Sequence, residues 1–92
     1  MPARRVVITG MGWVTPLGSD IDAVWSRLLA GESGIGPVSR FEASTFSTNF
    51  AAEVKSFRLE DFIDSTQPHA GAGLATRFAL AAAAQAWRGA SL

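Results

Sequence analysis

The side chains of this chain that could do chemistry are few. The chain has 92 residues, no cysteine and one histidine, His69. Thiolate nucleophiles, disulfides and two-histidine zinc motifs therefore cannot be built from this chain alone. His69 lies in a glycine-rich, loop-like stretch with no acid or thiol beside it, so we expect no catalytic role for it. The sequence predicts no catalytic, cofactor-binding or metal-binding residue within the chain.

Two short glycine motifs resemble functional signatures but are incomplete. Residues 10–12, Gly-Met-Gly, suggest a dinucleotide-binding loop, which needs a third glycine where this chain has Thr15 followed by Pro16. We therefore interpret residues 10–12 as a tight turn after a strand. Residues 31–34, Gly-Glu-Ser-Gly, suggest a nucleophile elbow, which needs a glycine where this chain has Ile35. We interpret Gly31 as the end of a helix.

The charged and aromatic side chains also favour structural roles. Asp20 and Asp22 could be imagined as metal ligands, but acids in the first turn of a helix are favoured by capping and by the helix dipole without any metal. The other structural assignments are a solvated helix face for Glu60, Asp61 and Asp64, a structural ion pair for Arg77, and packing for Trp13, Trp25 and Trp87.

The apolar runs predict two strands. Val6–Ile8 is a continuous apolar run, and it predicts a strand within residues 4–10 that is covered on both faces, as in the parallel sheet of an α/β protein. A second, short strand is predicted within residues 49–54. Between the predicted elements, residues 31–50 have the composition of a loop. This stretch contains Phe41, Phe46 and Phe50, so we expect it to pack against the rest of the protein.

Helical periodicity predicts the remaining elements. Ser19 and Asp22 resemble a capping box, and an apolar stripe follows them up to Gly31. A short helical turn is predicted over residues 59–64. A long helix is predicted from about Leu74 to Trp87, where the only polar residues are Thr76, Arg77 and Gln85. A helix that is apolar nearly all round needs cover on more than one side, which predicts further protein around it.

Composition limits the class of protein. The chain is 48% hydrophobic and 17% charged, and its eight basic residues balance its eight acidic ones. This balance argues against a disordered tail and against a nucleic-acid-binding arm. The apolar run near the amino terminus is only Val6–Ile8, shorter than the roughly 7–15 residues of a signal peptide, and no run in the chain reaches the roughly 20 of a membrane span. We expect a soluble, cytoplasmic protein with no nucleic-acid or membrane partner, of which residues 1–92 are an incomplete domain.

A family resemblance extends this interpretation. Residues 4–18 closely resemble the amino-terminal signature of β-ketoacyl-[acyl-carrier-protein] synthases of the KAS II type, the elongating condensing enzymes of fatty acid synthesis. The likeness continues through residues 25–35, 40–44, 50–54 and 78–92. It implies an α/β, thiolase-like fold layered αβαβα and built of two similar halves, with this chain as the beginning of the first half. Residues 1–92 would then be the amino-terminal part of the family's amino-terminal domain. It also implies a homodimer in the whole protein.

The resemblance implies a decarboxylative Claisen condensation in fatty acid or polyketide chain elongation. In such enzymes a cysteine takes an acyl group from acyl carrier protein, and two histidines help to decarboxylate the malonyl thioester. None of these residues can be placed on this chain, because it has no cysteine and His69 lies where the family has no catalytic histidine. The resemblance implies no cofactor, and we expect the chain alone to be inactive.

The resemblance is weakest just before the long helix. Family members often have a basic stretch there, near where carrier protein docks, whereas residues 67–78 keep only Arg77 and Phe78 of that pattern. Two alternatives therefore stay open: the same region of a non-catalytic, chain-length-factor-like paralogue, or a truncated structural or binding module. The module would fold alone, whereas we predict that the isolated chain aggregates or stays partly unfolded.

Overall fold

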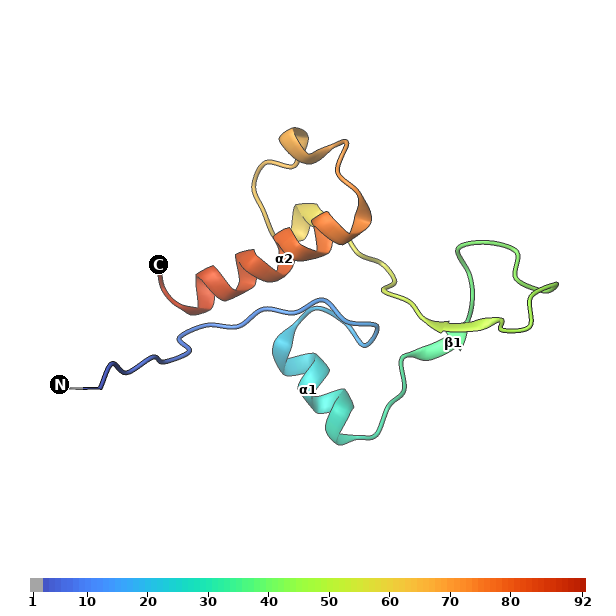
Figure 1. Cartoon of the computed structure of the whole chain (residues 1–92), viewed down its shortest axis with the longest axis horizontal. Coiled ribbons are helices and arrows are strands. Elements are labelled where there is room, and N and C mark those ends of the chain that lie inside the picture. Colours follow the sequence, from blue (N-terminus) through green and yellow to red (C-terminus); the bar gives the residue numbers. More distant parts are fainter. Residues whose placement is uncertain (1–2) are drawn as a thin grey trace. The chain divides into compact units, whose positions relative to one another are not determined.

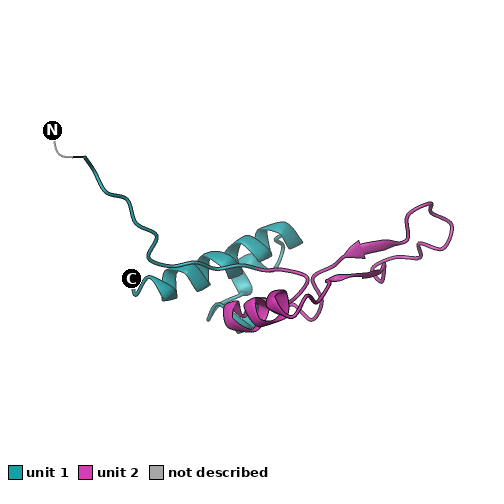
Figure 2. Ribbon diagram, turned by 90° about the horizontal axis from the view of Figure 1, so that it is seen from below, with its two compact units in different colours: residues 1–13, 59–92 teal, residues 14–58 magenta. Residues whose placement is uncertain are grey.

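The structure is a computed structural model that describes residues 3–92 (Figure 1). It divides into two compact units (Figure 2). One unit is Val14–Arg58, which contains helix α1 (Ile21–Leu29) and strands β1 (Ile35–Pro37) and β2 (Phe50–Ala52). The other combines the segment up to Trp13 with Leu59–Leu92, and it contains the 3₁₀ turns η1 (Leu59–Asp61) and η2 (Gln67–His69) and helix α2 (Leu74–Gly89).

Helix α1 begins one residue later than the capping box predicts. Asp20 is the N-cap, with an extended backbone, and its carboxylate accepts a hydrogen bond of 2.9 Å from the Ala23 N–H. The assignment of the cap to Ser19 is therefore wrong. Serine and aspartate are both good N-caps. The chain turns at Gly18, whose φ is +135°, and the position of this turn decides which of the two side chains reaches a free N–H of the first turn.

The end of α1 is confirmed at Gly31. Its φ is +75°, a left-handed conformation that glycine adopts without steric cost. The Gly31 N–H donates to the Leu28 carbonyl and the Glu32 N–H to the Arg27 carbonyl, each at 3.0 Å. These two bonds form a Schellman motif, which satisfies carbonyls at the helix end. Of the predicted apolar stripe, Val24 is buried, whereas the stripe residues Trp25, Leu28 and Leu29 are exposed.

The two strands form an antiparallel ribbon in which Ile35 lies opposite Ala52 and Pro37 opposite Phe50. Strand β2 confirms the prediction of a short strand within residues 49–54. Strand β1 was not predicted, because its Ile-Gly-Pro sequence contains the two residue types that most disfavour strands. Pro37 is tolerated here because each strand of a two-stranded ribbon is an edge strand.

The loop between the strands does not pack its phenylalanines down on the protein as predicted. Phe41, Phe46 and Phe50 are each more than half exposed. Phe41 and Phe46 instead contact each other edge to face, with ring centroids 5.6 Å apart. The aromatic residues therefore stabilise the loop locally.

The other unit is built around α2. The helix starts at Leu74 as predicted and continues two residues past Trp87, to Gly89. Turn η1 packs against α2 and buries Leu59, while Glu60, Asp61 and Asp64 are exposed, as predicted for a solvated face. Turn η2 was not predicted; Pro68, whose φ is fixed near the helical value, lies in its first residues.

The predicted strand within residues 4–10 is wrong in this structure. Residues 3–14 form no strand, and Val6, Val7 and Ile8 are 92%, 67% and 83% exposed. The residue types favour a strand, but a strand also needs a neighbour for its N–H and C=O groups, and no strand among the described residues pairs with this segment. No helix among residues 3–92 is long and apolar enough to cross a membrane.

Candidate functional site

The side chains considered for chemistry do not come together in one place. Within residues 3–92, no three His, Cys, Asp or Glu side chains gather where they could hold a metal ion. Asp20 caps α1, and Asp22 is exposed in its first turn. His69 lies in η2, where its backbone N–H donates to the Thr66 carbonyl at 2.9 Å.

Arg77 and the tryptophans also differ from their predicted roles. We predicted an ion pair for Arg77, but its guanidinium donates to the Ala70 carbonyl at 2.9 Å and so fixes the chain just before α2. Trp25 and Trp87 are 56% and 62% exposed, so they do not pack against other residues that the structure describes. Trp13 is half-buried, and its indole N–H finds no hydrogen-bond partner among the described residues.

A substitution separates the capping role of Asp20 from a metal-binding role. Asp20→Ala should weaken the start of α1 by about 1 kcal/mol, because the Ala23 N–H loses its acceptor. Asp20→Asn should retain most of the stability, since an amide oxygen also caps well. Hydrogen exchange at the Ala23 amide measures both effects. Equal losses in the two variants, together with a shift on adding a divalent cation, would favour the metal-binding role instead.

The first candidate site is the close contact between residues 10–13 and α2, which we call the glycine–alanine contact. A Cβ added to Gly12 would lie 2.7 Å from the Gln85 Cβ and closer still to the Ala82 carbonyl oxygen. A Cβ added to Gly10 would lie 2.6 Å from the Ala90 backbone nitrogen. Only glycine fits at these two positions, because the two backbones pack directly against each other.

The partner surface on α2 explains its alanines. Ala82, Ala86 and Ala90 recur every four residues and so follow one face of the helix, continuing to its C-cap. The Gln85 side-chain amide donates to the Trp13 carbonyl at 2.9 Å, which fixes the register of the contact. Residues 10–12 therefore run alongside α2 (Figures 1 and 2) without the predicted tight turn. Their glycines allow the two backbones to pack closely.

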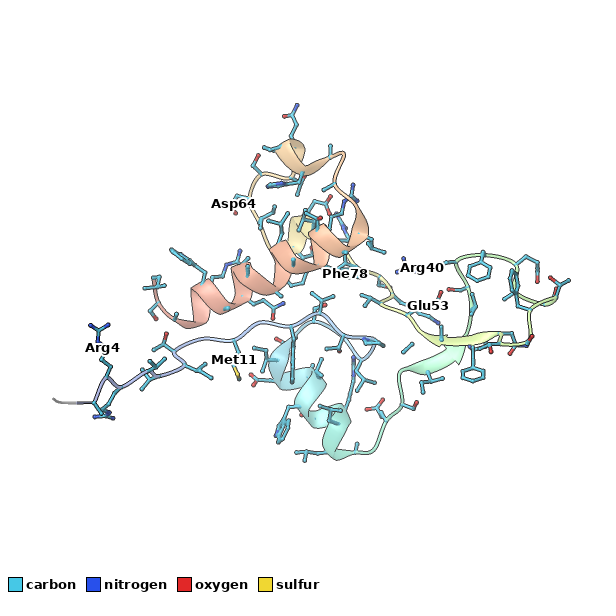
Figure 3. The ribbon with its side chains drawn as sticks, viewed as in Figure 1. Arg4, Met11, Arg40, Glu53, Asp64 and Phe78 are labelled. Carbon is cyan, nitrogen blue, oxygen red and sulfur yellow. The ribbon has the colours of Figure 1, made fainter. Side chains whose placement is uncertain are left out.

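The second candidate site is a polar cluster on the hairpin, formed by Ser39, Arg40 and Glu53 and called the Glu53 cluster here (Figure 3). The Ser39 hydroxyl donates to the Glu53 carboxylate at 2.8 Å, and the Ser39 N–H donates to the same carboxylate at 3.1 Å. The Arg40 Nε lies 3.8 Å from the carboxylate, and its guanidinium also donates to the Val54 carbonyl at 3.0 Å. The Glu53 side chain is only 8% exposed.

The electrostatics of this cluster oppose a role as general base. Hydrogen bonding from Ser39, with a smaller contribution from the Arg40 charge, lowers the pKa of the Glu53 carboxyl despite the opposing effect of burial. A carboxylate with a lowered pKa is a weaker base, so the Ser39–Glu53 pair is not an activated nucleophile. Beside the cluster lies an open hollow of about 840 Å³. Its lining residues come from β1, from the loop and from the start of β2: Gly36, Pro37, Val38, Ser39, Phe41, Glu42, Ala43, Ser44, Asn49 and Phe50.

Neither arrangement supplies an active site, so comparison with known proteins decides the assignment. A sequence model described as "Beta-ketoacyl synthase, N-terminal domain" matches residues 3–92. The chain belongs to the β-ketoacyl synthase family. This match confirms the resemblance seen in residues 4–18. It also confirms the prediction that the chain corresponds to the amino-terminal portion of these proteins.

Curated relatives agree with this assignment. The chain is 44% identical over all 92 residues to 3-oxoacyl-[acyl-carrier-protein] synthase 2 of Coxiella burnetii, and it spans 22% of that protein. It is 56% identical over 63 residues, 68% of the chain, to the chloroplastic 3-oxoacyl-[acyl-carrier-protein] synthase I of Hordeum vulgare, and the match spans 14% of that protein. The chain therefore spans about a fifth or less of the length of these synthases.

A solved structure confirms the fold class. The ishigamide ketosynthase/chain length factor superposes on 97% of the chain with a TM-score of 0.85 and 37% sequence identity, and the match covers 22% of that structure's chain. The chain is thus a β-ketoacyl synthase segment with the α/β, thiolase-like fold that the resemblance implies. The helices and the short hairpin are the part of that fold formed by residues 3–92.

Proposed function

We propose that this chain forms the amino-terminal part of a 3-oxoacyl-[acyl-carrier-protein] synthase, and that residues 1–92 are an incomplete portion of its amino-terminal domain. The observation that carries the proposal is the match along the whole chain, at 44% identity, to a synthase of that name. The reaction is a decarboxylative Claisen condensation between an acyl thioester and a malonyl thioester. The partners are acyl carrier protein and, in the whole protein, a second subunit; the location is the cytoplasm.

The chemistry of the condensation assigns a supporting role to these residues. A thiolate first takes the acyl group and releases the carrier thiol. Loss of CO₂ from the malonyl thioester then gives a carbanion, which attacks the acyl group and frees the thiolate. The chain has no cysteine, so the thiolate must come from protein outside these 92 residues. The contribution of the chain is the scaffold, in particular the glycine–alanine contact that holds residues 10–13 on α2.

A second candidate function is a chain-length-factor-like subunit, which keeps the fold without the nucleophile. It is favoured by the structural likeness to a ketosynthase/chain length factor. The coding sequence beyond Leu92 separates the two candidates. A cysteine at a strand-to-helix turn, followed by two histidines, supports the synthase, and a continuation of the family fold without that cysteine supports the chain-length factor.

Incubation with carrier protein that bears an acyl group tests the role that we assign to the chain itself. We expect the 92-residue chain to gain no acyl mass and to form no 3-oxoacyl product when malonyl-carrier protein is added, because it has no thiol. Intact-protein mass spectrometry measures the first result and thioester analysis the second. A stable acyl adduct on this chain would place the nucleophile within residues 1–92 and contradict the scaffold role.

A further inference from the structure

The hairpin loop takes an unusual course after β1. In the register of the ribbon, Val38 lies opposite Asn49, and its N–H donates to the Asn49 carbonyl at 2.9 Å. Continuation of that register would bring Ser39 opposite residue 48. Ser39 instead bonds to Glu53, which follows β2 at the other end of the ribbon. The loop therefore folds back along the hairpin directly after Val38.

We propose that residues 38–49 form a strap that the Glu53 carboxylate latches across the hairpin, and that release of this latch frees the strap and disrupts the open 840 Å³ hollow that the strap helps to line. This inference concerns a conformational device and is independent of the condensation chemistry proposed above. It rests on the contacts of one nearly buried carboxylate with two consecutive residues of the strap.

Three kinds of contact converge at the latch. The carboxylate accepts hydrogen bonds from the N–H and from the hydroxyl of Ser39, at 3.1 and 2.8 Å. Arg40 adds its charge at 3.8 Å and ties the strap to the chain beyond β2 through the Val54 carbonyl. Hydrogen bonds to an ionised acceptor are stronger than neutral ones, so the latch depends on the charge of Glu53.

The shape of the hollow depends on the same turn of the chain after Val38. Its lining combines β1 and the neighbouring Val38 with the strap segment Phe41–Ser44 and with Asn49 and Phe50 at the start of β2. Ser39 belongs both to the lining and to the latch. Movement of Ser39 away from Glu53 therefore removes one wall of the hollow.

Glu42 provides a matched control within the strap. It is also a carboxylate with a pKa lowered by hydrogen bonding, in this case from Ser44. Its carboxylate accepts a hydrogen bond from the Ser44 N–H at 3.0 Å, two positions along the chain. Both residues belong to the strap, so this bond does not join the strap to β2, as the Glu53 bonds do. Glu42→Gln therefore removes one carboxylate from the strap without touching the latch.

The test uses a chimera in which this whole chain replaces the matched residues of the Coxiella burnetii synthase 2. We expect Glu53→Gln to raise trypsin cleavage at the Arg40–Phe41 bond about tenfold, and to speed hydrogen exchange in residues 38–44 to a similar degree, because the charged acceptor is lost. Glu42→Gln should leave both rates within about twofold of the unaltered chimera.

The pH dependence gives a second readout. Glu53 has a lowered pKa in the latched form, so the latch is fully present above the ordinary pKa of a glutamate and is lost as the pH falls through the lowered value. Arg40 is the charged group in contact with Glu53, and the side chains of Lys55 and Glu42 are exposed. The exchange rates of the unaltered and Glu53→Gln chimeras should therefore differ at neutral pH and converge in acid.

Three results would overturn the latch. They are equal cleavage rates in the unaltered and Glu53→Gln chimeras, a Glu42→Gln effect as large as that of Glu53→Gln, and an unprotected Val38 amide in the unaltered chimera at neutral pH. The last result would show that the hairpin itself does not form. A Ser39→Ala variant, which removes only the hydroxyl donor, should give an intermediate cleavage rate, and an unchanged rate would contradict the assigned role of that hydroxyl.

Discussion

Gly12→Ala should separate residues 10–13 from α2 and destabilise the folded chimera by about 3 kcal/mol, at the upper end of the usual cost of overpacking. The added methyl group would lie 2.7 Å from the Gln85 Cβ and 2.8 Å from the Ala82 carbonyl carbon. The second of these atoms belongs to the backbone of a helix and cannot move without distorting it. The expected results are a lower thermal midpoint, a lower soluble yield and loss of synthase activity.

Gly71→Ala is the matched control for this prediction. Gly71 belongs to the same unit, but a Cβ added there meets no atom within 4 Å, and its φ is not in the left-handed region. The control should therefore leave the thermal midpoint unchanged. If Gly12→Ala behaved like Gly71→Ala, the close approach between residues 10–13 and α2 would be wrong.

The isolated 92-residue chain should not unfold cooperatively, and this is the second large effect that we expect. The buried apolar residues among those described are Val24, Ala43, Leu59 and Ala81, two of which are alanines. The large apolar side chains left exposed include Val6, Ile8, Leu29 and Leu92. A core this small does not offset the conformational entropy of ordering the chain.

Circular dichroism during heating and binding of a hydrophobic dye measure this behaviour. We expect a shallow, non-sigmoidal loss of helix signal, strong dye binding at low temperature, and aggregation as the concentration rises. The chimera is the control, because there the rest of the synthase can cover the apolar segments, and it should bind little dye. A single sharp transition of the isolated chain, with dispersed amide signals, would support a module that folds by itself.

Local patterns predicted the helices well. The apolar residues that follow Asp20 at helical spacing gave α1, and Gly31 ended it for the reason expected of a residue with φ of +75°. The start of α2 at Leu74 followed from the glycines before it. Helix periodicity and end signals depend on residues within a few positions of one another, so they can be read from one sequence.

Features that depend on distant residues could not be predicted in the same way. The β-branched run at residues 6–8 favours a strand, but the pairing that would make it one is absent from the described residues. The Gly-Met-Gly motif was read as a turn, because its actual partner, α2, lies some 70 positions away in the sequence. The Glu53 cluster was missed because its bonds join residues 14 positions apart across a fold-back that no local pattern specifies.

The family assignment came from residues for which we predicted no catalytic role. Residues 4–18 resembled the amino-terminal signature of β-ketoacyl synthases, and the family match over residues 3–92 bears this out. The physical role of part of that signature is now visible, since Gly10 and Gly12 allow backbone packing on α2. The signature therefore identified the family through its scaffold.

The synthase activity of the unaltered chimera tests the central claim most directly. The measurement is the rate at which the chimera forms 3-oxoacyl-carrier protein from acyl and malonyl thioesters, relative to the parent Coxiella burnetii synthase 2. If the chain is the amino-terminal scaffold of such a synthase, we expect the rate to stay within about tenfold of the parent, a loss of less than about 1.4 kcal/mol in transition-state stabilisation. A soluble, folded chimera without activity would contradict the account.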